Sequence, residues 1–123
     1  MKEENTYRQT IPSSTTGRYT ALTRKAMRIC YAAHEGQMDK SGVPYVFHPI
    51  HLAEQMETEE EICTALLHDV VEDTKWTLKE LEAEGFPTGV LEAVRLLTRE
   101  KDVPYMAYIE RLSGNQIARK VKL

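Results

Sequence analysis

The stretch TALLHDVVEDT, residues 64–74, combines an apolar helical pattern with four polar side chains. At about 100° per residue, the leucines and valines fall on one side of a helical wheel and the polar residues on the other: His68, Asp69, Glu72 and Asp73. An adjacent histidine and aspartate can direct their donor atoms at a single ion, and this ligand type suits Mn, Fe or Zn. Glu72 and Asp73 lie one turn further along, where they can orient ligands or exchange protons with a water. The pattern predicts a largely buried helix that carries a candidate metal site.

The same polar arc is also typical of the solvated face of an ordinary amphipathic helix. Apolar residues bracket the His68-Asp69 pair on both sides, however, and an ionised aspartate near a core is costly unless it is paired or bound to a metal. This favours a ligand role. Of the remaining histidines, we predict that His51 is a capping or surface residue and that His34 is a structural or pocket-wall residue.

Helical patterns continue on both sides of this stretch, and no convincing strand pattern is present. We expect a helix from about Ala21 to Gln37, a loop over residues 38–47, and a helix opened by His48-Pro49. The 64–74 stretch ends a helix that we expect to run from about Glu59 to Val71. Four more helical segments follow, the last marked by Ile117 and Val121. The predicted fold is an all-α bundle of six to seven short helices, with an irregular arm over residues 1–19 and one domain over residues 20–123.

Length and composition agree with a single globular domain. The chain has 123 residues, of which 28% are charged and 41% hydrophobic, and no apolar run is long enough to span a membrane. The N-terminus lacks the apolar core of a secretory signal, so a cytoplasmic location is expected. Cys30 and Cys63 are expected to be buried thiols, not a disulfide. A net charge of -3 gives no electrostatic footprint for nucleic acid.

The order of four motifs resembles the hydrolase domain of RelA/SpoT-type enzymes and the small stand-alone alarmone hydrolases. The motifs are AHEGQ (33–37), DKSGVPYVFHP (39–49), TALLHDVVEDT (64–74) and VKL (121–123). The resemblance implies an all-helical HD fold, a divalent metal ion, namely Mn²⁺, and removal of the 3′-pyrophosphate from guanosine tetra- and pentaphosphate. The small-molecule partner it implies is therefore a nucleotide.

The resemblance also implies roles for individual residues. The metal ligands it implies are His48, His68 and Asp69. It also implies that Glu72 and Asp73 handle the attacking water and its protons. The loop that faces the nucleotide in this family contributes Lys40, Ser41 and Tyr45.

Two departures from the family pattern leave alternatives open. In the family, the VKL run continues to an aspartate that is the fourth metal ligand, whereas this sequence ends at Leu123, so we expect the domain to be truncated there. A degenerate domain that binds a nucleotide or a protein without turnover is one alternative. Asp39 stands where better-known alarmone hydrolases carry an arginine, so a second alternative is that the substrate is another nucleotide or a phosphorylated metabolite. Exposed Ile117 and Val121 could also favour self-association.

Overall fold

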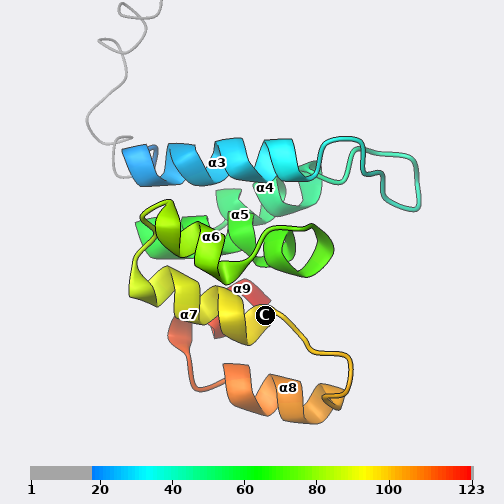
Figure 1. The fold of residues 1–123 in the computed structure, drawn as a ribbon, viewed down its shortest axis with the longest axis vertical. Helices are drawn as coiled ribbons and strands as arrows, with labels where there is room; N and C mark the ends of the chain where they lie inside the picture. Colours follow the sequence, from blue (N-terminus) through cyan, green and yellow to red (C-terminus); the bar gives the residue numbers. More distant parts are fainter. Residues whose placement is uncertain (1–17, 123) are drawn as a thin grey trace, which may run out of the picture.

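The structure is a computed structural model that describes residues 18–122, so the arm predicted over residues 1–19 lies almost entirely outside the described part. These residues form seven helices and contain no strand, apart from one isolated bridge between Met38 and Pro44. The helices are α3 (Ala21–Ala33), α4 (Phe47–Glu54), α5 (Glu59–Asp73), α6 (Leu78–Ala83), α7 (Thr88–Leu97), α8 (Tyr105–Leu112) and α9 (Gln116–Lys122) (Figure 1). The predicted all-α bundle is confirmed for this part of the chain.

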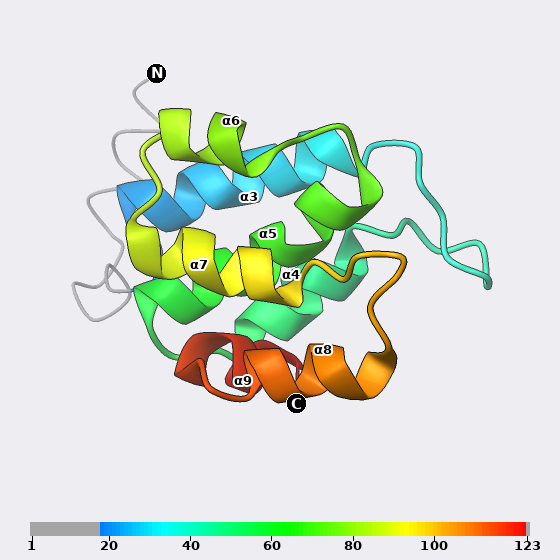
Figure 2. The ribbon, with the colours of Figure 1, turned by 60° about the horizontal axis from the view of Figure 1, so that its bottom comes forward.

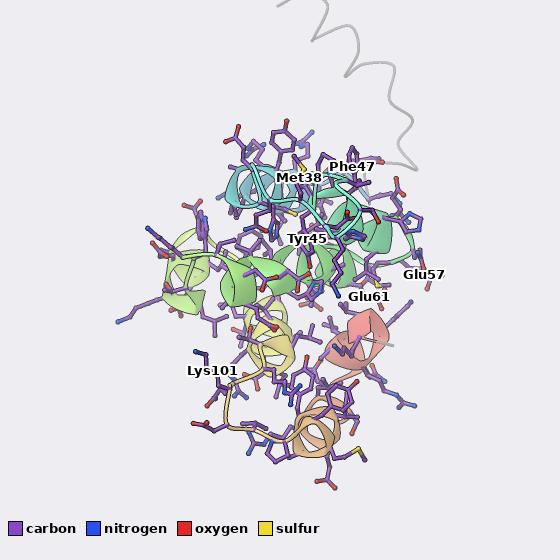
Figure 3. The ribbon with its side chains drawn as sticks, turned by 90° about the vertical axis from the view of Figure 1, so that its right-hand side faces the viewer. Met38, Tyr45, Phe47, Glu57, Glu61 and Lys101 are labelled. Carbon is purple, nitrogen blue, oxygen red and sulfur yellow. The ribbon has the colours of Figure 1, made fainter. Side chains whose placement is uncertain are left out.

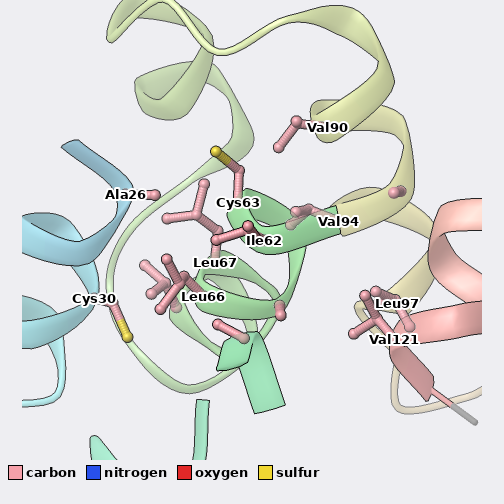
Figure 4. Packing of buried hydrophobic residues seen from close by; sticks show 14 of the residues in the cluster. Ala26, Cys30, Ile62, Cys63, Leu66, Leu67, Val90, Val94, Leu97 and Val121 are labelled. Carbon is pink, nitrogen blue, oxygen red and sulfur yellow. The ribbon is translucent and has the colours of Figure 1, made fainter. Parts of the chain in front are cut away.

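Helix α5 is the central element of the bundle. It contacts α3 and α4 on one side and α7 and α9 on the other, an arrangement that is visible in two views (Figures 1 and 2). Its buried side chains form the middle of the hydrophobic core (Figure 4): Ile62, Cys63, Ala65, Leu66, Leu67 and Val70. Full burial of each large aliphatic side chain contributes about 1.5–3 kcal/mol. The core therefore fixes the helix that carries the candidate site.

Both ends of α5 are defined by local hydrogen bonds. At the start, the Thr58 side chain accepts from the Glu61 backbone N–H, and the Glu61 carboxylate accepts from the Thr58 backbone N–H, which makes a capping box. At the end, the backbone of Thr74 is extended and its hydroxyl donates to the Val70 carbonyl. The helix thus runs two residues past the predicted end at Val71, and Glu72 and Asp73 belong to its last turn.

The predicted end of the first helix, at Gln37, is wrong. Helix α3 ends at Ala33, and His34 already has the backbone geometry of a cap. The reason is Gly36, whose φ of 85° is left-handed and incompatible with a continued helix. Residues 34–37 therefore form a tight turn that leads into the loop before α4.

Helix α9 does not present the exposed apolar stripe that the sequence suggested. Val121 is buried and Ile117 is half-buried, since α9 packs against α5 and α7. Lys120 adds contacts from its Nζ to a carboxylate oxygen of Glu57 at 3.0 Å and of Glu61 at 3.2 Å. The apolar stripe was the reason to expect self-association, and the structure removes that reason.

Cys30 and Cys63 are buried free thiols, as predicted. Burial raises the pKa of each thiol to about 12, so both stay protonated at neutral pH. Within residues 18–122, no helix is both long and apolar enough to cross a membrane.

Candidate metal centre

His68 and Asp69 present two acceptor atoms side by side on α5. The Nδ1 atom of His68 lies 2.8 Å from the Ala65 carbonyl oxygen, which can only accept, so Nδ1 carries the proton and Nε2 of the neutral ring has a lone pair. This Nε2 lies 3.3 Å from Asp69 Oδ1. Two acceptors at this separation repel each other unless a proton or a metal ion lies between them or binds both. The side chains remain 19% and 18% exposed, so solvent reaches the pair.

Tyr45 reaches the other oxygen of the same carboxylate from the loop before α4. Its hydroxyl donates to Asp69 Oδ2 at 2.5 Å, and Figure 3 shows Tyr45 between that loop and α5. Burial and the neighbouring Asp69 raise the pKa of Tyr45, so the phenol stays protonated and remains a donor. The two oxygens of Asp69 therefore have different environments, one at Tyr45 and one at His68.

His48 lies in the first turn of α4, as predicted, but its ring is engaged by Asp39. His48 Nε2 lies 2.8 Å from Asp39 Oδ2, and the ring centroid is 5.4 Å from that of Tyr45. In the described part of the chain, no three His, Cys, Asp or Glu side chains form a ready-made metal cluster. The structure thus brings His68, Asp69 and Tyr45 together and leaves the ligand role of His48 as a prediction.

Asp39 organises the loop in front of the site. Its Oδ1 atom accepts from the backbone N–H groups of Ser41 at 2.8 Å and Val43 at 3.0 Å. The Val43 hydrogen bond, followed by the one to His48, holds the pKa of Asp39 below its usual range. Lys40 and Ser41 are exposed at the tip of this loop, and their contact with substrate stays a prediction.

Glu72 and Asp73 form the exposed end of the polar arc on α5. Partial burial raises the pKa of both carboxyl groups, and the negative charge of Asp69 adds to the effect in each case. For Glu72, a hydrogen bond from the Arg99 backbone opposes the increase. Burial and the charge of Asp69 thus make it harder for Glu72 and Asp73 to ionise.

His34 and Gln37 adjoin the site, and sequence reasoning missed Gln37. The His34 ring is 1% exposed, with Nδ1 3.0 Å from Gln37 Oε1 and the ring centroid 5.1 Å from that of Tyr45. This agrees with the prediction of a structural or pocket-wall histidine. The signal for Gln37 was available in the AHEGQ motif, because a glycine turn brings its first and last polar residues together.

A family model for the HD domain matches residues 26–122. The chain is an HD domain. The match covers most of the chain and includes every predicted site residue, and it confirms the HD-type fold that the four motifs implied.

Curated relatives of this HD domain include enzymes of alarmone metabolism. A guanosine-3′,5′-bis(diphosphate) 3′-pyrophosphohydrolase of Haemophilus influenzae is 46% identical over 66 residues, which cover 50% of this chain and 10% of that protein. The bifunctional (p)ppGpp synthase/hydrolase SpoT of Escherichia coli is 44% identical over 75 residues, which cover 58% of this chain and 10% of that protein. A GTP pyrophosphokinase of Myxococcus xanthus is 42% identical over 82 residues, which cover 63% of this chain and 11% of that protein. The resemblance is confirmed, and the chain spans about a tenth of the length of these relatives.

HD domains typically bind a divalent metal ion, and the donor set of this chain fits one. His68 Nε2 and Asp69 Oδ1 are adjacent acceptors, and the bond from His68 Nδ1 to a backbone carbonyl is the outer contact that commonly orients a metal-binding histidine. An imidazole and a carboxylate together suit several first-row divalent metals.

Proposed function

We propose that this HD domain is a metal-dependent phosphohydrolase that removes the 3′-pyrophosphate from guanosine 3′,5′-bis(diphosphate). The observation that carries the proposal is the pair of acceptor atoms on α5, His68 Nε2 and Asp69 Oδ1, 3.3 Å apart. The names of the relatives give the substrate class.

In this proposal, His48, His68 and Asp69 hold the metal, and the expected ion is Mn²⁺. When bound, such an ion supplies a Lewis acid that activates water and offsets charge on the phosphoryl oxygens. His48 can take part through Nδ1, or through Nε2 once Asp39 releases it, because Asp39 engages Nε2 at 2.8 Å.

Glu72 and Asp73 are the proposed proton-transfer residues. The raised pKa of each carboxyl group eases retention of a proton, and the mutual repulsion of adjacent carboxylates favours a state in which one is protonated and the other is not. One can then accept a proton from the attacking water while the other donates to the leaving group. General acid and base catalysis of this kind contributes about 10²–10⁴-fold to a rate.

The loop before α4 is the proposed substrate-binding segment. Lys40 is exposed at its tip, where its ammonium group can offset phosphate charge. Ser41 can donate a hydrogen bond from its side chain to a phosphate, and Tyr45 offers its ring to the substrate while its hydroxyl is held by Asp69.

A second candidate substrate is favoured by Asp39. Its carboxylate lies in the substrate-binding loop and is fixed there by two backbone N–H groups and His48. An anion next to the nucleotide base favours substrates whose base or sugar offers hydrogen-bond donors, so another nucleotide or phosphorylated metabolite is the alternative. A domain that binds such a ligand without turnover is the alternative outside enzymes.

The experiment is a Mn²⁺-dependent assay of phosphate and pyrophosphate release across a panel of guanosine tetraphosphate, guanosine pentaphosphate, GTP, ATP and 3′-phosphorylated adenosine nucleotides. We expect pyrophosphate from the first two, and no release from the His68→Ala protein. Glu82→Gln, on the exposed face of α6, is the control variant and should retain full activity.

Release of phosphate or pyrophosphate from another panel member alone would show that the proposed substrate is wrong and that the hydrolase function is correct. If wild-type protein with bound Mn²⁺ binds a nucleotide in the panel yet turns over none of them, the binding module is correct and the hydrolase proposal is wrong.

A further inference from the structure

The two ring nitrogens of buried His34 differ in their hydrogen bonding within the described part of the chain. Nδ1 pairs with Gln37 Oε1 at 3.0 Å, whereas Nε2 has no hydrogen-bond partner among the residues that the structure describes. A buried polar atom left unpaired costs about 1–3 kcal/mol. Since an aliphatic side chain would fill the same space without that cost, the imidazole needs an explanation beyond core packing.

The hydrogen bonds of Gln37 determine the tautomer of this ring. Gln37 Nε2 lies 3.5 Å from the Asp73 backbone carbonyl, which can only accept, so the amide NH₂ group faces Asp73 and the amide oxygen faces His34. The amide oxygen in turn requires a donor, so His34 Nδ1 carries the proton. Gln37 thus fixes the His34 ring and ties the turn after α3 to the last turn of α5.

The fixed ring lies against the tyrosine that orients Asp69. The centroids of His34 and Tyr45 are 5.1 Å apart at an interplanar angle of 51°, within the range of favourable aromatic pairs. Tyr45 donates to Asp69 Oδ2 at 2.5 Å, which leaves Oδ1 beside His68 Nε2. A continuous series of contacts therefore runs from Gln37 through His34 and Tyr45 to Asp69.

We propose that His34 and Gln37 are positioning residues: they hold the Tyr45 ring so that its hydroxyl fixes the Asp69 carboxylate with Oδ1 available to a metal ion. The effect on a metal ion rests on the proposed function. The effect on the Asp69 carboxylate does not depend on the proposed function, and it can be measured in the absence of metal.

The first test is NMR spectroscopy of the metal-free protein. Ring ¹⁵N shifts of His34 should show a protonated Nδ1 and an unprotonated Nε2. Gln37→Leu, at a partly exposed position, and His34→Phe should each move the ¹³C resonance of the Asp69 carboxyl group and the ring resonances of Tyr45. Thr64→Val is the matched control, because Thr64 on α5 is equally buried and its hydroxyl also has no partner among the described residues.

The second test is the Mn²⁺ affinity of Gln37→Leu, Tyr45→Phe, the double variant of the two and Thr64→Val, measured with the melting temperature of each metal-free form. Loss of an outer contact typically weakens metal binding by about 10–100-fold, so we expect this loss for Gln37→Leu and Tyr45→Phe. The double variant should lose no more than the larger single loss, because both changes act through one carboxylate. Thr64→Val should bind Mn²⁺ as the wild type does, and a purely structural role of Gln37 would lower only the melting temperature.

The outcomes separate this inference from the proposed function. If the Asp69 resonance is the same in wild type, Gln37→Leu and His34→Phe, the positioning role is overturned, whether or not metal binds. When wild-type protein binds Mn²⁺, the role is also overturned if the resonance moves in Gln37→Leu while the Mn²⁺ affinity of this variant equals that of the wild type. If the resonance moves and wild-type protein binds no divalent metal, positioning of the carboxylate is supported and the proposed function fails.

Discussion

At the level of single residues, hydrogen bonds to fixed acceptors decide which atom of each histidine is available. The Ala65 carbonyl leaves Nε2 of His68 open, while Asp39 engages Nε2 of His48. A helical wheel predicts that His68 and Asp69 share a face, and it does so correctly. It carries no information about a loop residue such as Asp39, whose partner is nine positions away along an irregular backbone.

The loop before α4 should lose order in acid. The pKa of Asp39 is lowered in the folded protein, so its ionised form stabilises the loop at every pH above the ordinary aspartate value of about 3.9. That stabilisation disappears as the pH falls through the lowered pKa. We expect the amide resonances of Ser41 and Val43 to titrate together with a midpoint below the ordinary value, and Asp39→Asn to abolish the transition. A midpoint at or above the ordinary value would contradict this explanation.

Glu72→Gln should separate activity from stability. A raised carboxyl pKa means that the ionised group destabilises the folded state at neutral pH, a penalty that vanishes as the pH falls below the raised value. The neutral amide removes that penalty, so the metal-free protein should melt at a higher temperature. The hydrolysis rate should fall by about 10²–10⁴-fold because a proton-transfer group is lost. A lower melting temperature combined with an unchanged rate would contradict both roles of Glu72.

At the level of helices, periodicity predicted where most elements lie but not where each one ends. The Thr77–Glu80 capping box that begins α6 is a signal that sequence can carry, since both partners lie within four residues. The apolar pattern of α3 stops at Ala33, and the predicted end at Gln37 was one turn too late because the left-handed backbone of Gly36 does not continue the helix. The turn after α3 was therefore missed, and with it the contact between His34 and Gln37.

Thr58→Ala should weaken α5 without disturbing the site at its other end. Loss of the N-cap hydroxyl removes the acceptor for the Glu61 backbone N–H and typically costs about 1 kcal/mol. Thermal and denaturant unfolding should show this loss, and the Mn²⁺ affinity should stay at the wild-type value. Thr77→Ala removes the corresponding N-cap hydroxyl of the capping box in α6 and should give a similar loss of stability. If Thr58→Ala lost Mn²⁺ affinity but kept its stability, the cap and the site would be coupled, contrary to this prediction.

For the whole molecule, one core holds α5 among the other helices, so stability and site geometry share the same residues. Leu67 is fully buried one position before His68. Leu67→Ala should therefore cost about 2–5 kcal/mol in the free energy of unfolding, in a single cooperative transition. Met106→Ala, at a side chain that is 76% exposed on α8, should change it by no more than about 0.5 kcal/mol. Equal losses in the two variants would contradict the core described here.

The amount of Mn²⁺ bound per chain, in wild type and in His68→Ala at equal protein concentration, tests the proposed metal centre directly. The acceptor pair His68 Nε2 and Asp69 Oδ1 predicts one ion per wild-type chain and almost none in the variant, with both proteins folded. Equal metal content in the two folded proteins would contradict a metal centre on α5 and the hydrolase function that depends on it.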